Sequence, residues 1–254
     1  MRILLTNDDG INAPGLVVLE KIARALSDDI WICAPDEEQS GAGHSLTLSR
    51  PVRLRQHGER RFSVSGTPTD AVTMALRKVL PAAPDLILSG VNRGANLGDD
   101  VTYSGTVSAA MEGALAGIPA IALSQVYAKE GVGDDVSFDA AATWGEKVLR
   151  PLVEVPFAPR TLINVNFPPV AGGEVKGIRV VRQGFHDYAR GSVVECTDPR
   201  GYRYFWFGLH GIEHTPGHAT DLEAIGDGFV SVTPLHLDLT HQASLAMLAT
   251  RFPA

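Results

Sequence analysis

Residues 1–10 read MRILLTNDDG, a short apolar run that ends on an asparagine, two aspartates and a glycine. The run from Arg2 to Thr6 has the apolar character of a buried strand. Asp8 and Asp9 repel each other where this strand leaves the core, and the repulsion costs stability unless a cation binds there. A surface turn explains the same residues equally well, because Asn, Asp and Gly are the commonest turn formers. The rest of the sequence has to decide between a cation site and a turn.

The composition is that of an ordinary globular protein. The chain has 254 residues, of which 44% are apolar and 20% charged, so it fits one large domain or one domain with an appendage. The net charge is -7 and the basic residues form no stripe, which argues against a nucleic-acid polymer as a partner. The sequence contains no run of about 18 apolar residues and no export-signal pattern, so we expect no contact with a membrane. Cys33 and Cys196 have no metal-motif partner, which is typical of a reducing compartment, and we expect a cytoplasmic protein.

Apolar strands that alternate with amphipathic helices predict a Rossmann-like, three-layer α/β core with a parallel sheet. We expect this core to occupy residues 1–168. The predicted strands are 2–6, 30–34, 85–89, 120–123 and 162–165, with an antiparallel pair formed by 46–55 and 62–65. The predicted helices start near Pro14, after Thr67 and after Thr106, and a fourth helix runs from a cap at Ser137 to about Leu149.

The pattern changes in residues 169–254, where we expect an extended β-hairpin, a closing strand and a C-terminal tail. The expected elements are a strand over 178–182, a hairpin over 185–206 with its turn at 198–201, a helical turn over 221–225, a strand over 229–233 and a helix within 241–252. A lone hairpin is marginally stable and needs a surface to lie on, for which a partner subunit is one candidate. Because no linker isolates this region, we expect it not to be an independent domain.

Polar residues follow the successive strands of the predicted sheet. In an open parallel sheet, ligands bind beyond the carboxyl ends of the strands, so these residues are expected to share one crevice. They are Asn7, Asp8 and Asp9 after the first strand, Ser40 after the second, Asn92 and Asn96 after the third, and Ser104, Gly105 and Thr106 at the start of the next helix.

This residue set contains only oxygen ligands, which suit Mg²⁺ or Mn²⁺ better than zinc. The start of a helix at Ser104 is also a natural anion site, because free N–H groups and the helix dipole point outward there. A hard cation beside an anion pocket is typical of phosphate chemistry. Each part also has an ordinary structural explanation as a turn, a backbone cap or a helix cap, and the joint occurrence at successive strand ends favours a site. We interpret seven of the eight histidines as surface residues or hairpin contacts; they are His44, His186, His210, His214, His218, His236 and His241.

These motifs resemble the SurE family of survival-protein nucleotidases. The matching segments span nearly the whole chain in order: 2–10, 34–36 with 40–41, 66–70, 89–92, 94–100, 103–106, 109–113 and 230–235. The resemblance implies a metal-dependent phosphatase that acts on nucleoside 5′- and 3′-monophosphates and, in some members, on short polyphosphate. It also implies one divalent cation per subunit, Mg²⁺ or Mn²⁺, bound by Asp8, Asp9, Ser40 and Asn92.

The same resemblance places the phosphate beside Asn96, Ser104, Gly105 and Thr106, and we add Asn7 and Gly41 to this substrate-binding group. It further implies a homodimer or homotetramer that exchanges the C-terminal hairpin and tail. We expect either Asp8 or Asp9 to act as the general base toward water, and the sequence leaves this choice open. Two other hypotheses stay open: a non-catalytic nucleotide-binding stress sensor that uses the same crevice, and a structural oligomer in which the Asp pair is only a turn.

Overall fold

The computed structural model describes residues 1–127, 137–186, 191–209 and 219–252, and a large mixed sheet lies at its centre. Within these residues the sheet has nine strands in the order β3-β4-β2-β1-β5-β6-β7-β11-β8. The strands are β1 Arg2–Thr6, β2 Asp29–Pro35, β3 Leu54–Gly58, β4 Arg61–Val64, β5 Leu86–Arg93, β6 Ala120–Gln125, β7 Thr161–Phe167, β8 Ile178–Val180 and β11 Val230–His236. From β4 to β7 all neighbours pair in parallel, which confirms the predicted parallel core.

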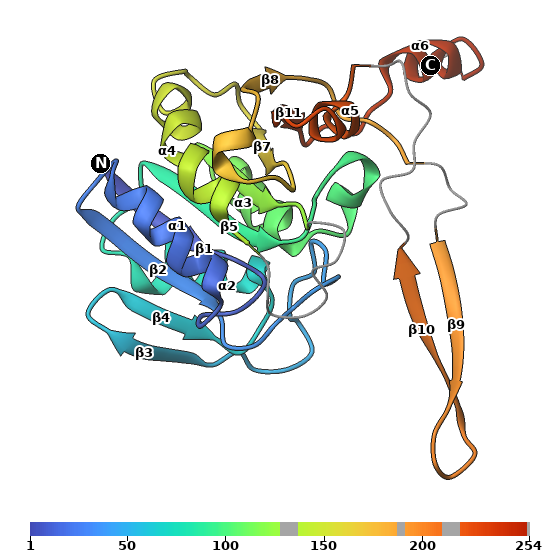
Figure 1. Ribbon diagram of the computed structural model, residues 1–254, viewed down its shortest axis with the longest axis horizontal. Coiled ribbons are helices and arrows are strands. Elements are labelled where there is room, and N and C mark those ends of the chain that lie inside the picture. The colour runs from blue at the N-terminus through green and yellow to red at the C-terminus, as the bar shows by residue number, and fades with distance from the viewer. Residues whose placement is uncertain (128–136, 187–190, 210–218, 253–254) are drawn as a thin grey trace.

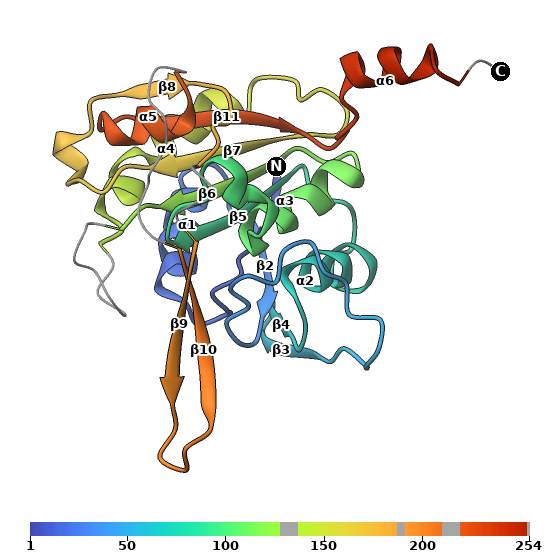
Figure 2. The same ribbon diagram turned by 90° about the vertical axis from the view of Figure 1, so that its right-hand side faces the viewer.

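Helices cover both faces of this sheet, and the alternation of side chains along β1 assigns each face (Figure 2). Ile3 and Leu5 pack with α1 and α4 in one apolar cluster, whereas Leu4 packs with α2 and α3 in the other. The helices are α1 Pro14–Arg24, α2 Pro68–Met74 with a π-helical continuation over Ala75–Val79, α3 Gly105–Leu115 and α4 Asp139–Leu152. The fold is therefore the predicted three-layer α/β arrangement.

Several boundaries differ from the prediction: β5 continues to Arg93, β8 ends at Val180, the hairpin strands run from Gly191 to Leu209, and β11 continues to His236. Two further differences have a clear local cause. The segment 46–53 is not a strand, and β3 begins only at Leu54. Pro51 has no N–H to donate to a ladder, and Leu48 is 85% exposed, so this segment does not pair as a strand. It is attached instead by single contacts, among them the hydrogen bonds that Arg53 exchanges with Ser65. The fourth helix begins after Phe138, and the Ser137 hydroxyl accepts only the N–H of Asp139. It also continues beyond Leu149, whose carbonyl still accepts a hydrogen bond from the N–H of Val153.

The C-terminal region has two parts that behave differently. β11 pairs with β7 and β8, so this strand extends the central sheet. By contrast, β9 Gly191–Thr197 and β10 Arg203–Leu209 form a separate antiparallel ribbon that projects away from the sheet (Figure 1). Its turn lies where predicted, and the Asp198 carboxylate accepts N–H groups of Arg200 and Tyr202 there.

The chain ends in two further helices. α5 Asp221–Gly226 packs against β11, and α6 Gln242–Ala249 extends away from the body toward the C-terminus (Figure 2). None of the residues of α6 is buried, although most are apolar. Among the described residues, no helix combines the length and the apolar character that crossing a bilayer requires.

The cap of α2 provides a test of the fold. The Asp70 carboxylate accepts the N–H groups of Thr47 and Thr67, and the Thr67 hydroxyl in turn accepts the N–H of Asp70. Burial alone raises the pKa of Asp70, but the hydrogen bonds from Thr47 and Thr67 outweigh it and hold this pKa below its ordinary value. A lowered folded pKa stabilises the protein above the unfolded pKa, and this contribution is lost as the pH falls through the folded value.

We therefore expect Asp70→Ala to lower the free energy of unfolding by about 1–3 kcal/mol near neutral pH. The difference in the free energy of unfolding between wild type and Asp70→Ala should decrease below about pH 4, where the Asp70 carboxyl of the unfolded chain becomes protonated. Urea unfolding across this pH range measures both effects, with the exposed Asp28→Ala as the control. A difference that does not change with pH would contradict this account.

Candidate active site

The polar ends of β1 and β5 lie side by side because the two strands pair in parallel, with Thr6 opposite Ser89. Asn7, Asp8 and Asp9 leave β1 at this edge, and Asn92 lies near the end of β5. The register between β5 and β6 shifts between Ser89 and Asn92, and such irregularities redirect side chains next to functional sites. The topology therefore places these predicted residues together at the carboxyl edge of the sheet.

Asp8 is held against the first turn of α3. Its side chain is buried, and its Oδ1 accepts the hydroxyl of Thr106. A Cβ built on Gly105 would lie 2.8 Å from Asp8 Cβ and 3.0 Å from Asp8 Oδ2. Only glycine permits this approach, so Gly105 sets the distance between the carboxylate and the helix. Ser104 caps the same helix, because its Oγ accepts the N–H of Val107 at 3.0 Å.

Asp9 is half-buried and belongs to a chain of hydrogen bonds that reaches the Ser40 loop. Asp9 Oδ2 accepts the backbone N–H of Arg93 at 3.1 Å, and the Arg93 guanidinium donates to Glu38 at 3.1 Å. Glu38 also accepts the hydroxyl of Ser40 at 2.7 Å. A backbone bond of 2.8 Å from Gln39 to the carbonyl of Asp8 closes this loop onto β1. The exposed loop that carries Ser40 and Gly41 is thus tied to both aspartates.

The two carboxylates are costly to ionise together. Burial raises the pKa of Asp8 to about 7, and the charge of Asp9 adds to the rise. Burial also raises the pKa of Asp9, although the N–H and the charge of Arg93 oppose it. Bound positive charge favours the ionised form of both groups. The electrostatics therefore match the predicted cation site better than an ordinary exposed turn.

The other side-chain oxygen atoms near Asp8 and Asp9 are of the type that binds a hard divalent cation. Asn7 is fully buried, and its Oδ1 has no hydrogen-bond partner among the described residues. The side-chain nitrogen of Asn92 donates to the carbonyl of Gly94. The side-chain oxygen of Asn92 is therefore the atom that could bind a cation. In the described part of the chain no three His, Cys, Asp or Glu side chains gather as a metal cluster. Amide, hydroxyl and water or substrate oxygens would therefore have to complete the coordination of a cation at the Asp8–Asp9 pair, and Mg²⁺ and Mn²⁺ accept such ligands.

Asn96 is placed differently from the other predicted residues. Its side-chain nitrogen donates to Ser124 Oγ at 2.8 Å, and its backbone N–H donates to Asn166 at 2.9 Å. Its carbonyl accepts the amide nitrogens of Asn164 and Asn166. These bonds anchor the loop after β5 to β6 and β7, and the contact of Asn96 with phosphate stays a prediction.

The C-terminal region holds the same loop, through two residues that the sequence did not indicate. The fully buried Asp221 accepts the N–H groups of Gly98 at 2.9 Å and of Gly184 at 2.8 Å. His186 has a side chain that is only 2% exposed and is hydrogen-bonded to Asp99. Of the two alternatives offered for His186, a surface residue or a hairpin contact, the surface position is wrong, because the Asp99 carboxylate gives its buried ring a partner. His210, His214 and His218 lie outside the described residues.

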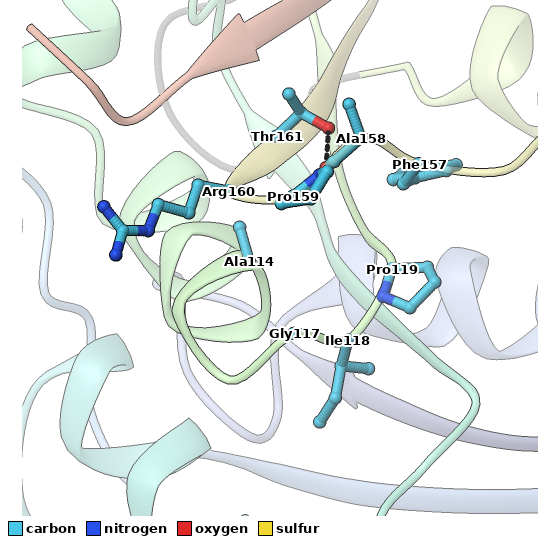
Figure 3. A pocket seen from close by; sticks show the side chains of 9 residues that line it. All are labelled: Ala114, Gly117, Ile118, Pro119, Phe157, Ala158, Pro159, Arg160 and Thr161. Atoms are coloured by element: carbon cyan, nitrogen blue, oxygen red, sulfur yellow. Dashed lines mark hydrogen bonds between the residues drawn. The ribbon is translucent and has the colours of Figure 1, made fainter.

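A separate cavity of about 250 Å³ lies at the opposite edge of the sheet (Figure 3). It is lined by the loop before β6 and the segment that enters β7, including Ile118, Phe157 and Thr161. This is the amino end of both strands, away from the aspartates. Its position excludes it as part of the site described here.

The family of the chain follows from its similarity to known proteins. The family model described as Survival protein SurE matches residues 3–190. The chain belongs to the SurE family. Its relatives include the 5′-nucleotidase SurE of Erythrobacter litoralis (strain HTCC2594), which is 69% identical over 99% of this chain and 100% of that protein. Another relative, the 5′-nucleotidase SurE of Rhizorhabdus wittichii, is 68% identical over 97% of each chain.

A solved member of the SurE family has the same overall structure. The crystal structure of the SurE protein from Aquifex aeolicus is 38% identical to this chain and superimposes with a TM-score of 0.83. The match covers 99% of both chains, so it includes the C-terminal region as well as the parallel core.

The close contact at Gly105 gives a direct test of the site. A methyl group at this position must displace either Asp8 or Pro68, whose Cγ would lie 3.0 Å away. We expect Gly105→Ala to weaken Mn²⁺ binding by about 10- to 100-fold, as for other changes that move a metal ligand indirectly. Isothermal titration measures this affinity without requiring turnover.

The control is Gly173→Ala, because nothing lies within 4 Å of a Cβ built there. This variant should bind Mn²⁺ like the wild type. Equal Mn²⁺ affinities of the wild type and Gly105→Ala would show that the first turn of α3 does not position a metal ligand.

Proposed function

We propose that this protein is a divalent-metal-dependent nucleotidase that hydrolyses nucleoside 5′- and 3′-monophosphates to nucleoside and phosphate, with short polyphosphate as a further substrate. The observation that carries the proposal is the adjacent Asp8–Asp9 pair held against the first turn of a helix. Relatives at 68% and 69% identity over nearly the whole chain are named 5′-nucleotidase, which supports the same activity here.

In this proposal one Mg²⁺ or Mn²⁺ ion binds to Asp8, Asp9, Ser40 and Asn92. When bound, the cation supplies positive charge that polarises the phosphoryl group of the substrate. The first turn of α3 binds the phosphate, because the N–H groups of a first turn lack partners within the helix and the helix dipole is positive there. The hydroxyl of Thr106 joins the two halves of the site, since it donates to Asp8 from within that turn.

We assign the general base to Asp9. Asp8 is buried and its Oδ1 already accepts the Thr106 hydroxyl, whereas Asp9 is half-buried and lines an open cavity of about 140 Å³. Asp9 can therefore reach a water molecule that approaches the phosphorus atom. The overall charge of -7 does not oppose binding of an anion, because the local field of the cation and of α3 acts on the phosphate at short range.

A panel of nucleoside monophosphates tests the activity. The wild type should release phosphate with Mg²⁺ or Mn²⁺ and lose this activity in EDTA. Asp9→Asn should lower kcat by at least about 100-fold, the lower range for loss of a catalytic acid or base. The exposed Asp28→Asn serves as the matched control and should keep the wild-type rate. Nucleotide binding without phosphate release would instead indicate a sensor, and a lack of both would leave the Asp pair as a turn.

We also propose that residues 169–254 assemble the chain into a homodimer or homotetramer. On the β9–β10 ribbon, Trp206 is 65% exposed and Phe207 is 87% exposed. Leu245 and Met247 are similarly exposed on α6. Exposed apolar side chains on elements that extend away from the sheet are typical of interaction sites, and a partner subunit would bury them.

The free Cys33 and Cys196 support a reducing cytoplasmic environment.

Light scattering at several protein concentrations tests the assembly. The wild type should have a mass of at least two chains, and Phe207→Ser should shift the protein toward single chains by removing apolar contact from the ribbon. Val17→Ser removes a comparably apolar exposed residue from α1 and should not change the mass. A single-chain mass for the wild type at micromolar concentration would contradict this proposal.

A further inference from the structure

The segment that carries Ser40 runs from the carboxyl edge of the sheet to the helix α2. It is attached at its start to the end of β1, where the N–H of Gln39 donates to the carbonyl of Asp8 at 2.8 Å. It is attached at its far end to the N-cap of α2, where the hydroxyl of Thr67 donates to the carbonyl of Ser45 at 2.7 Å. The exposed Ser40 therefore lies in a segment with defined attachment points on both sides.

The middle of this segment is attached to α3 by a side chain. His44 Nε2 lies 2.7 Å from Glu112 Oε1, and because a carboxylate only accepts hydrogen bonds, the imidazole nitrogen is the donor. The N–H of Gly43 also donates to the carbonyl of Tyr103 at 3.1 Å, just before α3 begins. His44 thus links the segment to the helix four residues after Ser40.

A second hydrogen bond holds the carboxylate of Glu112. Its Oε2 accepts the hydroxyl of Thr73 on α2 at 3.3 Å, so α2 and His44 each bind one oxygen of the same group. The side chains of His44 and Glu112 are 35% and 21% exposed. Partly exposed pairs of this kind contribute little to the stability of a fold. We therefore expect the protein to fold without the pair, although the loop would lose its contact with α3.

The helix α3 contacts both segments that carry proposed ligands of the cation. The hydroxyl of Thr106, in its first turn, donates to Asp8. Glu112 lies further along the same helix and accepts the hydrogen bond from His44. Because α3 packs against β5 and β6, it gives both contacts a common and well-supported frame.

We propose that His44 and Glu112 are positioning residues for the cation, which hold the Ser40 loop at the correct distance from Asp8 without touching the metal or the substrate. The inference rests on the proposed function, in which Ser40 and Asp8 bind the same ion. Outer contacts that orient metal ligands typically contribute about 10- to 100-fold to metal affinity. Since His44 acts on Ser40 through the intervening backbone, its contribution lies at the lower end of this range.

Isothermal titration with Mn²⁺ in the absence of substrate tests the proposal. His44→Ala should weaken Mn²⁺ binding about tenfold. His44→Gln places an amide nitrogen where Nε2 lies, so this variant should bind Mn²⁺ within about twofold of the wild type. Glu112→Ala removes the other partner and should cause the same loss as His44→Ala, which provides a second test if one of the two variants does not fold.

The matched control is His57→Ala. His57 Nε2 lies 2.8 Å from Ser63 Oγ between β3 and β4, so this variant also loses a short histidine contact, but one outside the Ser40 loop. It should bind Mn²⁺ like the wild type. Ser40→Ala removes the ligand itself, and adding His44→Ala should then cause no further loss, because His44 acts through Ser40.

Two results would overturn the proposal. One is an equal Mn²⁺ affinity of the wild type and His44→Ala, which would show that the pair is only structural. The other is a further loss of about tenfold when His44→Ala is added to Ser40→Ala, because independent sites behave additively.

Phosphate release from a nucleoside monophosphate separates this inference from the proposed function. Because the pair acts on the cation, saturating Mn²⁺ should restore the kcat of His44→Ala to the wild-type value, and a kcat that stays low would contradict the assignment. A wild type whose Mn²⁺ binding depends on His44 but which releases no phosphate would refute the nucleotidase function and leave the positioning role in place.

Discussion

The contact between Asp8 and the first turn of α3 is the constraint on which the rest of the site depends. It joins a buried carboxylate at the end of β1 to the Thr106 hydroxyl and requires a glycine at position 105. The contact brings a negative charge that is costly to bury next to the positive end of a helix dipole, a combination that suits a cation on one side and a phosphate on the other. In the proposed site, β1 and α3 would therefore fix both the position of the cation and the position of the phosphate.

Segments from both the N-terminal and the C-terminal regions stabilise the arrangement of β1 and α3. The Ser40 loop is tied to Asp8 by a backbone hydrogen bond and to Asp9 through Glu38 and Arg93. The loop between β5 and α3 is held by Asp221, which follows the projecting ribbon in the sequence. The region that we propose to mediate assembly therefore also supports the loop that leads into the first turn of α3, the proposed phosphate site. An assembled protein would have this support reinforced by burial of the apolar ribbon.

Much of the fold could be predicted because its determinants are local. Apolar runs such as Arg2–Thr6 indicate buried strands, and the Thr67 to Asp70 spacing indicates a helix cap that the structure confirms. Parallel pairing then brings the predicted site residues to one edge. What could not be predicted depends on side-chain contacts between distant segments. His186 finds a buried partner in Asp99, Asn96 turns its amide toward Ser124, and Asp221 binds backbone groups far away in sequence. Periodicity and motif spacing carry no information on such contacts.

The most direct test of the central claim is the position of a bound metal ion and a phosphate mimic in crystals of the full chain grown with Mn²⁺ and vanadate. Anomalous scattering from manganese would locate the ion independently of any activity. Our account predicts one manganese ion in contact with Asp8 and Asp9, with the vanadate against the N–H groups of the first turn of α3. Manganese bound elsewhere, or vanadate bound away from this turn, would contradict the claim that these two elements together form the active site.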